Sequence, residues 1–258
     1  MTLNYELDGK HKMIRMAVRE FAESEIRPVA GDLEDNEEFS VSLTQQMGDI
    51  GLFGMVVPEK YGGQGLDYVS YIIAVEEIAR VDGSQAATIA AGNSLGIGPL
   101  YYFGTEEQKQ QWLPKMVSGE AFGALAMTEP GAGSDVQGIR TNAVRDGDDY
   151  VLNGAKVFIT NGDIADIITV MALTDPSLGA YGGITAFIVE ADSPGYEVGR
   201  HEDKMGIRCV PVVEIHLEDC RVPVDNLLGG SEGRGFKHAM ITLDRARPGV
   251  RFQRWAFW

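Results

Sequence analysis

The chain has 258 residues, more than one average domain holds, so two linked domains are expected. Hydrophobic residues make up 44% and charged residues 23%, a composition typical of globular proteins and unlike that of disordered ones. The formal net charge of -16 argues against binding to nucleic acids or anionic membranes, and an anionic ligand would need a local cluster of basic groups.

The N-terminal residues, Met1 to Asp8, lack the basic start and apolar run of a signal peptide. No apolar stretch reaches the length that crosses a membrane. Cys209 and Cys220 are too few for a disulfide scaffold and suit a reducing compartment, although a single pair between them stays open. We therefore expect a cytoplasmic protein.

Helical patterns dominate the first half of the chain. Ile14, Val18 and Phe21 recur at the spacing of one helical face, which predicts an amphipathic helix over Lys10–Val29. Gly, Pro and Asp separate the further predicted helices, which are Ser40–Ile50, Tyr68–Arg80 and one that Thr105 opens. An all-helical N-terminal domain follows from this pattern.

Short runs rich in β-branched and aromatic residues replace the helical pattern near Ala121. The predicted strands are Tyr150–Leu152, Lys156–Thr160, Ile167–Leu173, Ile184–Val189 and Val212–Leu217. Turn sequences lie between them, at Asp146–Asp148, Asn161–Asp163 and Pro194–Gly195. The pattern predicts an antiparallel sheet or barrel, followed by a helix at Gly235–Leu243, so the fold class is α+β.

A glycine-rich segment, Ala126-Met127-Thr128-Glu129-Pro130-Gly131-Ala132-Gly133-Ser134-Asp135, joins the two halves, with Gly138 shortly after. Such a loop exposes backbone N–H groups and lets a planar or phosphorylated ligand approach closely, although an ordinary turn can use the same residues. The string resembles the signature of the acyl-CoA dehydrogenase family without a mismatch. The resemblance implies an FAD-dependent enzyme.

A second segment, Leu152 to Gly162, resembles the family strand that lies beside the flavin ring. By this match Phe158 packs on the flavin and Thr160 offers its hydroxyl, while many members carry Trp in place of Phe158. Without the resemblance, a Phe in a strand would more commonly belong to a core. The FAD contacts implied by the two segments are Leu125, Met127, Thr128, Gly133, Ser134, Phe158, Ile159 and Thr160.

Further segments match the family in the same order along the chain. They are Pro58–Gly63, Phe103–Lys109, Gly183–Glu190 and Lys204–Arg208, so the resemblance covers nearly all of Lys10–Val250. It implies a helical domain over residues 1–122, a middle β domain over 123–228, and the start of a C-terminal helical domain over 229–258.

The segment Leu243 to Pro248 resembles the family stretch near the bound CoA thioester. Asp244 and Arg247 are then substrate contacts, with Ser134 as a third, and Arg247 would be a donor that lets an acidic protein hold an anion. The alternative is a solvated basic patch. The resemblance implies a short-chain, butyryl-CoA-like substrate, dehydrogenation to a trans-2-enoyl-CoA, and an electron-transferring flavoprotein as acceptor.

The family's catalytic base is a Glu in the C-terminal helical domain, and the rarer alternative position just before Arg247 is Ala246 here. We therefore expect no catalytic residue in this chain and no turnover by it. Much of the family's tetramer interface and part of its FAD site also belong to that domain, which puts oligomerisation and FAD retention in doubt.

The final residues, Arg251 to Trp258, do not resemble the small-residue helix of the family. Reading the codons of Arg254 to Phe257 one base earlier would restore small, aliphatic residues, which suggests a frameshift or an early stop. A genuine short tail that packs as an amphipathic cap is the alternative.

Other cofactors find no support in the sequence. His11, His201, His216 and His238 lack metal-ligand spacing, and no nucleotide-binding GxGxxG or Walker loop is present. Two other functions stay open: a flavin oxidase or hydroxylase of the same fold, and a non-catalytic remnant that serves as a partner surface.

Overall fold

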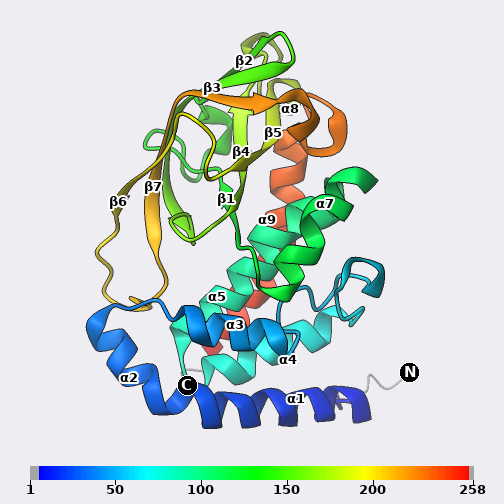
Figure 1. The fold of residues 1–258 in the computed structure, drawn as a ribbon, viewed down its shortest axis with the longest axis vertical. Coiled ribbons are helices and arrows are strands. Elements are labelled where there is room, and N and C mark those ends of the chain that lie inside the picture. Colours follow the sequence, from blue (N-terminus) through cyan, green and yellow to red (C-terminus); the bar gives the residue numbers. More distant parts are fainter. Residues whose placement is uncertain (1–5, 256–258) are drawn as a thin grey trace.

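The computed structural model describes residues 6–255 and shows a helical layer below a curled β-sheet (Figure 1). The helix α9 runs from the sheet down into the helical layer, so it contacts both. Residues 256–258, part of the tail for which a frameshift is hypothesised, lie outside the described residues. The α+β fold class is confirmed.

The helical layer contains seven α-helices, joined in two places by π-helical turns at Ala22–Ile26 and Gly92–Ile97. The seven helices are α1 (Gly9–Phe21), α2 (Arg27–Asn36), α3 (Val41–Asp49), α4 (Tyr68–Ala79), α5 (Gly83–Ala91), α6 (Gly98–Phe103) and α7 (Glu106–Ser118). The predicted helix over Lys10–Val29 is real but continues through the first π-helical turn to Asn36.

Side-chain caps set the starts of the predicted helices. Ser40 accepts a hydrogen bond from the backbone N–H of Leu43 at the start of α3 (3.2 Å). Thr105 and Gln108 exchange hydrogen bonds at the start of α7 and form a capping box. The sequence did not predict α5 and α6, because both are buried on most sides and show no polar face to reveal a helical period.

The upper layer is a seven-stranded sheet. Its strands are β1 (Gly123–Ala126), β2 (Asn142–Asp146), β3 (Asp149–Thr160), β4 (Ile167–Leu173), β5 (Ile184–Glu190), β6 (Tyr196–His201) and β7 (Val212–Pro223), with the short helix α8 (Ala180–Gly183) before β5. The two strands predicted at Tyr150–Leu152 and Lys156–Thr160 are both parts of β3. Strands β1, β2 and β6 escaped prediction because they are short and lack a clear alternation of buried and exposed positions.

The sheet is mixed, and the expectation of purely antiparallel pairing is corrected at β4, which runs parallel to two neighbours, β1 and, through Asn142 opposite Leu173, β2. Strand β1 pairs with β4 in parallel, with Gly123 opposite Ile167. The chain between them makes the β2–β3 hairpin and is long enough to return in the same direction. The predicted tight turns are confirmed by positive φ angles at Gly147 (66°), Asn161 (63°) and Gly195 (85°).

The last helix, α9 (Gly235–Trp255), is longer than the predicted Gly235–Leu243. It continues past Pro248, which lacks the N–H that a helix interior uses and therefore hid the continuation. At Gly249 the helix lies directly on Tyr71 of α4, since a Cβ atom there would come within 2.6 Å of the Tyr71 hydroxyl oxygen.

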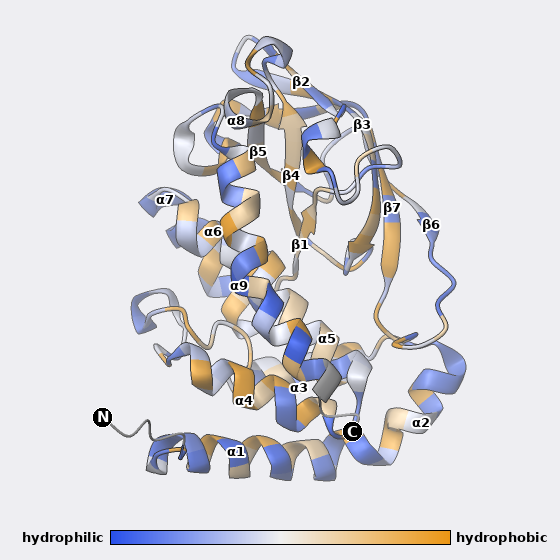
Figure 2. Ribbon diagram, turned by 180° about the vertical axis from the view of Figure 1, so that it is seen from behind, coloured by the Kyte–Doolittle hydropathy of each residue, from blue (hydrophilic) through white to orange (hydrophobic). Residues whose placement is uncertain are grey.

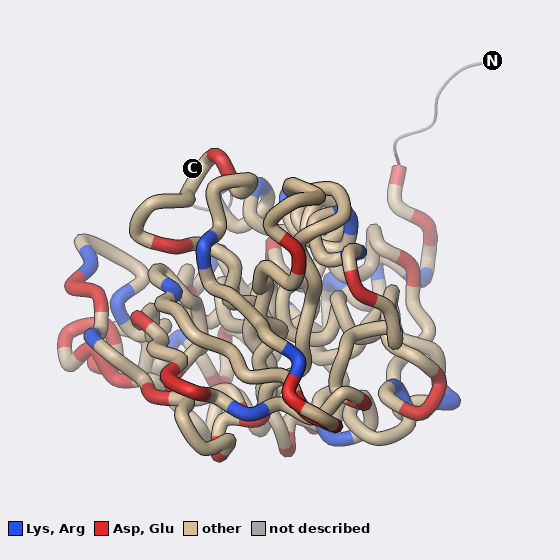
Figure 3. Tube along the Cα trace, turned by 90° about the horizontal axis from the view of Figure 1, so that it is seen from above, with Lys and Arg blue, Asp and Glu red and all other residues tan. Residues whose placement is uncertain are grey.

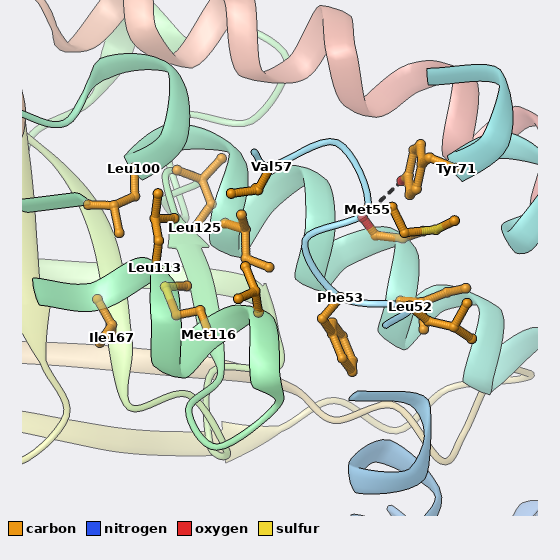
Figure 4. Packing of buried hydrophobic residues seen from close by; sticks show 14 of the residues in the cluster. Leu52, Phe53, Met55, Val57, Tyr71, Leu100, Leu113, Met116, Leu125 and Ile167 are labelled. Carbon is orange, nitrogen blue, oxygen red and sulfur yellow. Dashed lines mark hydrogen bonds between the residues drawn. The ribbon is translucent and has the colours of Figure 1, made fainter. Parts of the chain in front are cut away.

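One apolar core joins the helices to the sheet (Figure 4). Leu125 of β1 and Ile167 of β4 pack in the same cluster as Leu113 and Met116 of α7. A second core lies inside the curled sheet and includes hydrophobic residues of β4 and β7, two strands coloured largely as hydrophobic in Figure 2. The domain boundaries at residues 122 and 228 stay a prediction.

Acidic residues lie around the whole outline of the molecule, with basic residues between them (Figure 3). Cys209 and Cys220 are both buried and free, so the open possibility of a disulfide between them is not realised. Within residues 6–255, no helix is both long and apolar enough to cross a membrane.

Candidate functional site

The glycine-rich loop follows β1 and begins with a tight turn. Glu129 and Ala132 exchange backbone hydrogen bonds of 3.1 and 3.0 Å, while Pro130, Gly131, Gly133 and Ser134 are exposed. A Cβ atom added to Gly131 or Gly133 would meet no atom within 4 Å. The protein itself therefore does not require glycine at these positions, which fits a loop that a ligand approaches closely.

Glu129 and Lys156 form a buried ion pair beneath this loop. The Lys156 ammonium, fully shielded from solvent, lies 2.8 Å from Glu129 Oε1 and also donates to the carbonyl oxygens of Met127 (3.2 Å) and Met171 (2.6 Å). Glu129 accepts further hydrogen bonds from the backbone N–H groups of Arg140 (2.7 Å) and Thr141 (3.0 Å). All three ammonium protons thus have acceptors.

The pair remains ionised at neutral pH. Burial lowers the pKa of Lys156 to about 8, although the Glu129 carboxylate opposes this shift. Burial alone would raise the pKa of Glu129, but the charge and hydrogen bond of Lys156 outweigh it, so the net shift of that pKa is downward. The salt bridge ties β3 to the loop, and the two carbonyl hydrogen bonds tie Lys156 to Met127, directly after β1, and to Met171 of β4.

Phe158 follows the ion pair on β3 and faces solvent. Its side chain is 62% exposed, whereas its neighbours Val157 and Ile159 are buried. Between Lys156 and Ile159, β3 has one residue more than β7, which pairs these two residues with Ile215 and Val213. The extra residue is a β-bulge that reverses the inward and outward alternation of the strand.

Phe158 also has a left-handed backbone, with φ at 59°. An aromatic residue in this conformation is uncommon, and such strain of about 1–3 kcal/mol is found mainly at ligand sites. The core alternative for Phe158 is wrong, since the bulge turns its ring out of the sheet.

The other residues implied by the signature lie around this bulge. The backbone N–H of Val157 donates to the carbonyl oxygen of Thr128 (2.9 Å), so the loop and the aromatic position are adjacent. Thr160 is half-buried two residues further, opposite Val212 of β7. Leu125, Met127 and Ile159 are buried, and their side chains belong to the protein core or its edge.

The residues implied as substrate contacts lie on α9 and on the loop. The Arg247 guanidinium forms a close ion pair with the Asp244 carboxylate, and both side chains are about two-thirds exposed. Within the part of the chain that the structure describes, no hydrogen bond or ion pair joins Ser134 to them. Arg245 beside them instead packs over the Tyr102 ring, 4.3 Å from its centre.

Sequence reasoning singled out neither Glu129 nor Lys156, although both lie in the matched segments. A signal was present: Lys156 is a basic residue in a run that is otherwise apolar, and such a residue is buried only with a partner. Over residues 6–255 there is no group of three or more His, Cys, Asp and Glu side chains that could hold a metal ion.

The residues present fit a flavin. The exposed Phe158 ring offers an apolar face, and the hydroxyls of Thr128, Ser134 and Thr160 offer hydrogen bonds to the polar edge of such a ligand. A separate hollow of about 290 Å³ opens on the other part of the loop, where Pro130, Gly131 and Arg140 are among the lining residues, and it does not include Phe158.

Two domain models of one family match the chain. The acyl-CoA dehydrogenase N-terminal domain covers residues 8–120, and the acyl-CoA dehydrogenase middle domain covers residues 124–220. The short-chain specific acyl-CoA dehydrogenase of Clostridium acetobutylicum is 43% identical over 251 residues, which make up 97% of this chain and 66% of that protein. The chain thus spans slightly less than two thirds of this relative.

Solved structures agree with this match. Butyryl-CoA dehydrogenase from Megasphaera elsdenii superimposes with a TM-score of 0.94 at 41% identity, over 98% of this chain and 67% of that one. A chain in a structure of the electron transferring flavoprotein of Acidaminococcus fermentans has a TM-score of 0.96 at 45% identity, over 98% and 66%.

A glutaryl-CoA dehydrogenase from Mycobacterium smegmatis, solved in complex with FADH2, has a TM-score of 0.90 at 34% identity, over 97% of this chain and 62% of that one. TM-scores of 0.90 to 0.96 over at least 97% of this chain show that the three structures share its fold. The chain therefore belongs to the acyl-CoA dehydrogenase family, whose members are FAD-dependent enzymes.

Proposed function

We propose that the chain carries the helical and middle-domain part of a short-chain acyl-CoA dehydrogenase site, with FAD held between the glycine-rich loop and the bulge of β3. The observation that carries the proposal is the exposed, left-handed Phe158 directly beside Thr128 of that loop. Solvent exposure of a large aromatic ring costs free energy unless a ligand covers it.

The polar part of the site would hold the cofactor through the loop. Gly133 and Ser134 would present backbone N–H groups and a hydroxyl. Thr128 and Thr160 would add hydroxyls close to Phe158, since Thr128 accepts a hydrogen bond from Val157 and Thr160 follows Phe158 by two residues on β3. Leu125, Met127 and Ile159 would contribute to the FAD site through their backbone groups and by supporting the surface beneath the cofactor, because their side chains are buried.

The acyl-CoA thioester would lie across Ser134 and the exposed face of α9. The Arg247 guanidinium is suited to an anionic ligand, and Asp244 orients it through their ion pair. A butyryl-length acyl group is proposed because the relatives of Clostridium and Megasphaera are named as short-chain and butyryl-CoA dehydrogenases.

The reaction removes a proton from the carbon next to the thioester carbonyl, and bound FAD would accept the hydride that leaves the neighbouring carbon. A carboxylate must lie within hydrogen-bond reach of that proton. The position before Arg247 is occupied by Ala246, which is buried and carries no ionisable group. This chain's own residues would therefore bind and orient the thioester without removing the proton.

An electron-transferring flavoprotein is the proposed acceptor, supported by the similarity to a chain in the Acidaminococcus structure. A cytoplasmic, reducing location is proposed from the free thiols of Cys209 and Cys220.

The test is the visible absorption spectrum of the 258-residue chain with FAD, before and after addition of butyryl-CoA. We expect a bound flavin whose spectrum shifts with butyryl-CoA but stays oxidised, and a weaker shift in Arg247→Gln. Bleaching of the flavin would mean that a carboxylate of this chain reaches the substrate. Absence of any bound flavin would refute the proposed cofactor site.

A further inference from the structure

The β-bulge in β3 exposes Phe158 to solvent. Burial of its apolar ring would instead favour a regular strand, so other residues must stabilise the bulge. In a regular strand, positions 156 and 158 would face the same side of the sheet. Here Lys156 is fully buried and Phe158 is 62% exposed, while Ile159 is buried again. The strand therefore gains one residue between two positions that are both anchored inside the sheet.

The anchor on the N-terminal side of the bulge is Lys156. Its ammonium reaches three different segments: the end of β1 through the Met127 carbonyl, the loop through Glu129, and β4 through the Met171 carbonyl. The next residue, Val157, donates its N–H to Thr128, so two consecutive residues of β3 are fastened to the loop. Ile159 anchors the other side by its burial in the core of the sheet.

We infer that Lys156 is a positioning residue for the flavin face: by binding Met127, Glu129 and Met171 it holds the bulge that turns Phe158 outward beside the glycine-rich loop. The inference deepens the proposed function and rests on it for the identity of the ligand. The bulge itself is a property of the chain alone, so it can be tested without any flavin.

The experiment compares two proteins: the natural chain, which contains the Glu129–Lys156 ion pair, and a double variant that combines Glu129→Gln with Lys156→Met. The double variant removes both charges, so it leaves no unpaired buried ion and should be more stable than Lys156→Met alone. Lys115→Met is the matched control, because Lys115 is an exposed lysine of α7. Thermal unfolding of each protein establishes that it is folded.

Phe158→Cys is placed in each background as a reporter, and the rate of its modification by a thiol reagent is measured without FAD. The two native thiols react slowly, because burial raises the pKa of Cys209 and Cys220 to about 11. Without the ammonium, the bulge relaxes to a regular pleat and position 158 turns toward the core. We expect modification to slow by about tenfold or more in the double variant, since a buried thiol is inert.

An unchanged modification rate in the folded double variant would overturn the inference, since the bulge would then persist without Lys156. FAD affinity, measured by fluorescence quenching in proteins that retain Phe158, provides the second readout. We expect it to fall in the double variant and to stay unchanged in Lys115→Met. If the natural chain binds no FAD, the proposed function fails, while the thiol rates still decide the role of Lys156.

Discussion

Each half of the molecule contains a buried ionic cluster, and the two clusters are built in opposite ways. In the helical layer, the Glu77 carboxylate of α4 is 2% exposed and is paired with Arg15, Arg19 and Arg80, all of which are one-third to one-half exposed. In the sheet, Lys156 is fully buried and its partner Glu129 is nearly so.

This difference in burial predicts that the fold depends more on the charge of Lys156 than on that of Glu77. The arginines around Glu77 keep much of their hydration, so the loss of the carboxylate leaves no buried ion behind. Loss of the Lys156 ammonium would leave the Glu129 carboxylate in the interior with only backbone donors. The first cluster joins α1 to α4, whereas the second holds the parts of the candidate site together.

The largest effect is therefore expected for Lys156→Met. The free energy of unfolding should fall by about 3–5 kcal/mol, because the substitution leaves an uncompensated buried carboxylate. Urea denaturation followed by circular dichroism measures it. Addition of Glu129→Gln should restore most of the lost free energy of unfolding. A double variant as unstable as Lys156→Met alone would show that the packing of the lysine side chain, and not its charge, stabilises the fold.

Glu77→Gln should cost less, about 2–3 kcal/mol, because it weakens charged hydrogen bonds without burying an ion. The neighbouring Glu76, which is 30% exposed and pairs with Arg15, provides the control. Glu76→Gln should change the free energy of unfolding by about 0–1 kcal/mol. Equal losses in the two variants, measured in the same urea titrations, would contradict the special role of the Glu77 cluster.

His238 of α9 extends the comparison to a partly buried group that forms no ion pair with any residue in 6–255. Its ring stacks on Phe103 (4.2 Å between centres), and its buried Nδ1 atom finds no hydrogen-bond partner in the part of the chain that the structure describes. Burial, together with the nearby positive charges of Arg234 and Lys237, lowers the pKa of His238 from 6.5 to about 4. The unfolded chain therefore binds a proton between pH 6.5 and 4 that the folded chain rejects.

As a result, the stabilising contribution of neutral His238 is complete above pH 6.5 and is lost as the pH falls toward 4. Between pH 6.5 and 4 the free energy of unfolding of the natural chain should fall. We expect this fall to be about 1–2 kcal/mol smaller in His238→Gln. The measurement is the free energy of unfolding of both proteins at pH 7 and pH 4.5. Parallel pH profiles would show that folding does not lower the pKa of His238.

The sequence predicted the long amphipathic helices, the capped helix starts and the main strands, because these carry a visible period or cap. It missed α5 and α6, whose burial on most sides removes the period, and it ended α9 too early at Pro248. The site was predicted mainly through the family resemblance. The left-handed bulge at Phe158 depends on the pairing of β3 with β7, which local sequence does not reveal.

The contacts of Lys156 could not be predicted from the local sequence either. A lysine in an apolar strand indicates a buried partner, but three of its contacts come from residues 15 to 29 positions away in the chain. Only the folded sheet brings Met127, Glu129 and Met171 to one ammonium group.

The most direct test of the candidate site is a titration of the 258-residue chain with FAD, compared with Phe158→Ala and with Val144→Ala as control. Val144 is also 62% exposed and also lies on a strand of the sheet. We expect Phe158→Ala to raise the dissociation constant for FAD about tenfold, which corresponds to about 1.4 kcal/mol, and Val144→Ala to leave it unchanged. Equal affinity in all three proteins would contradict the placement of the flavin against Phe158.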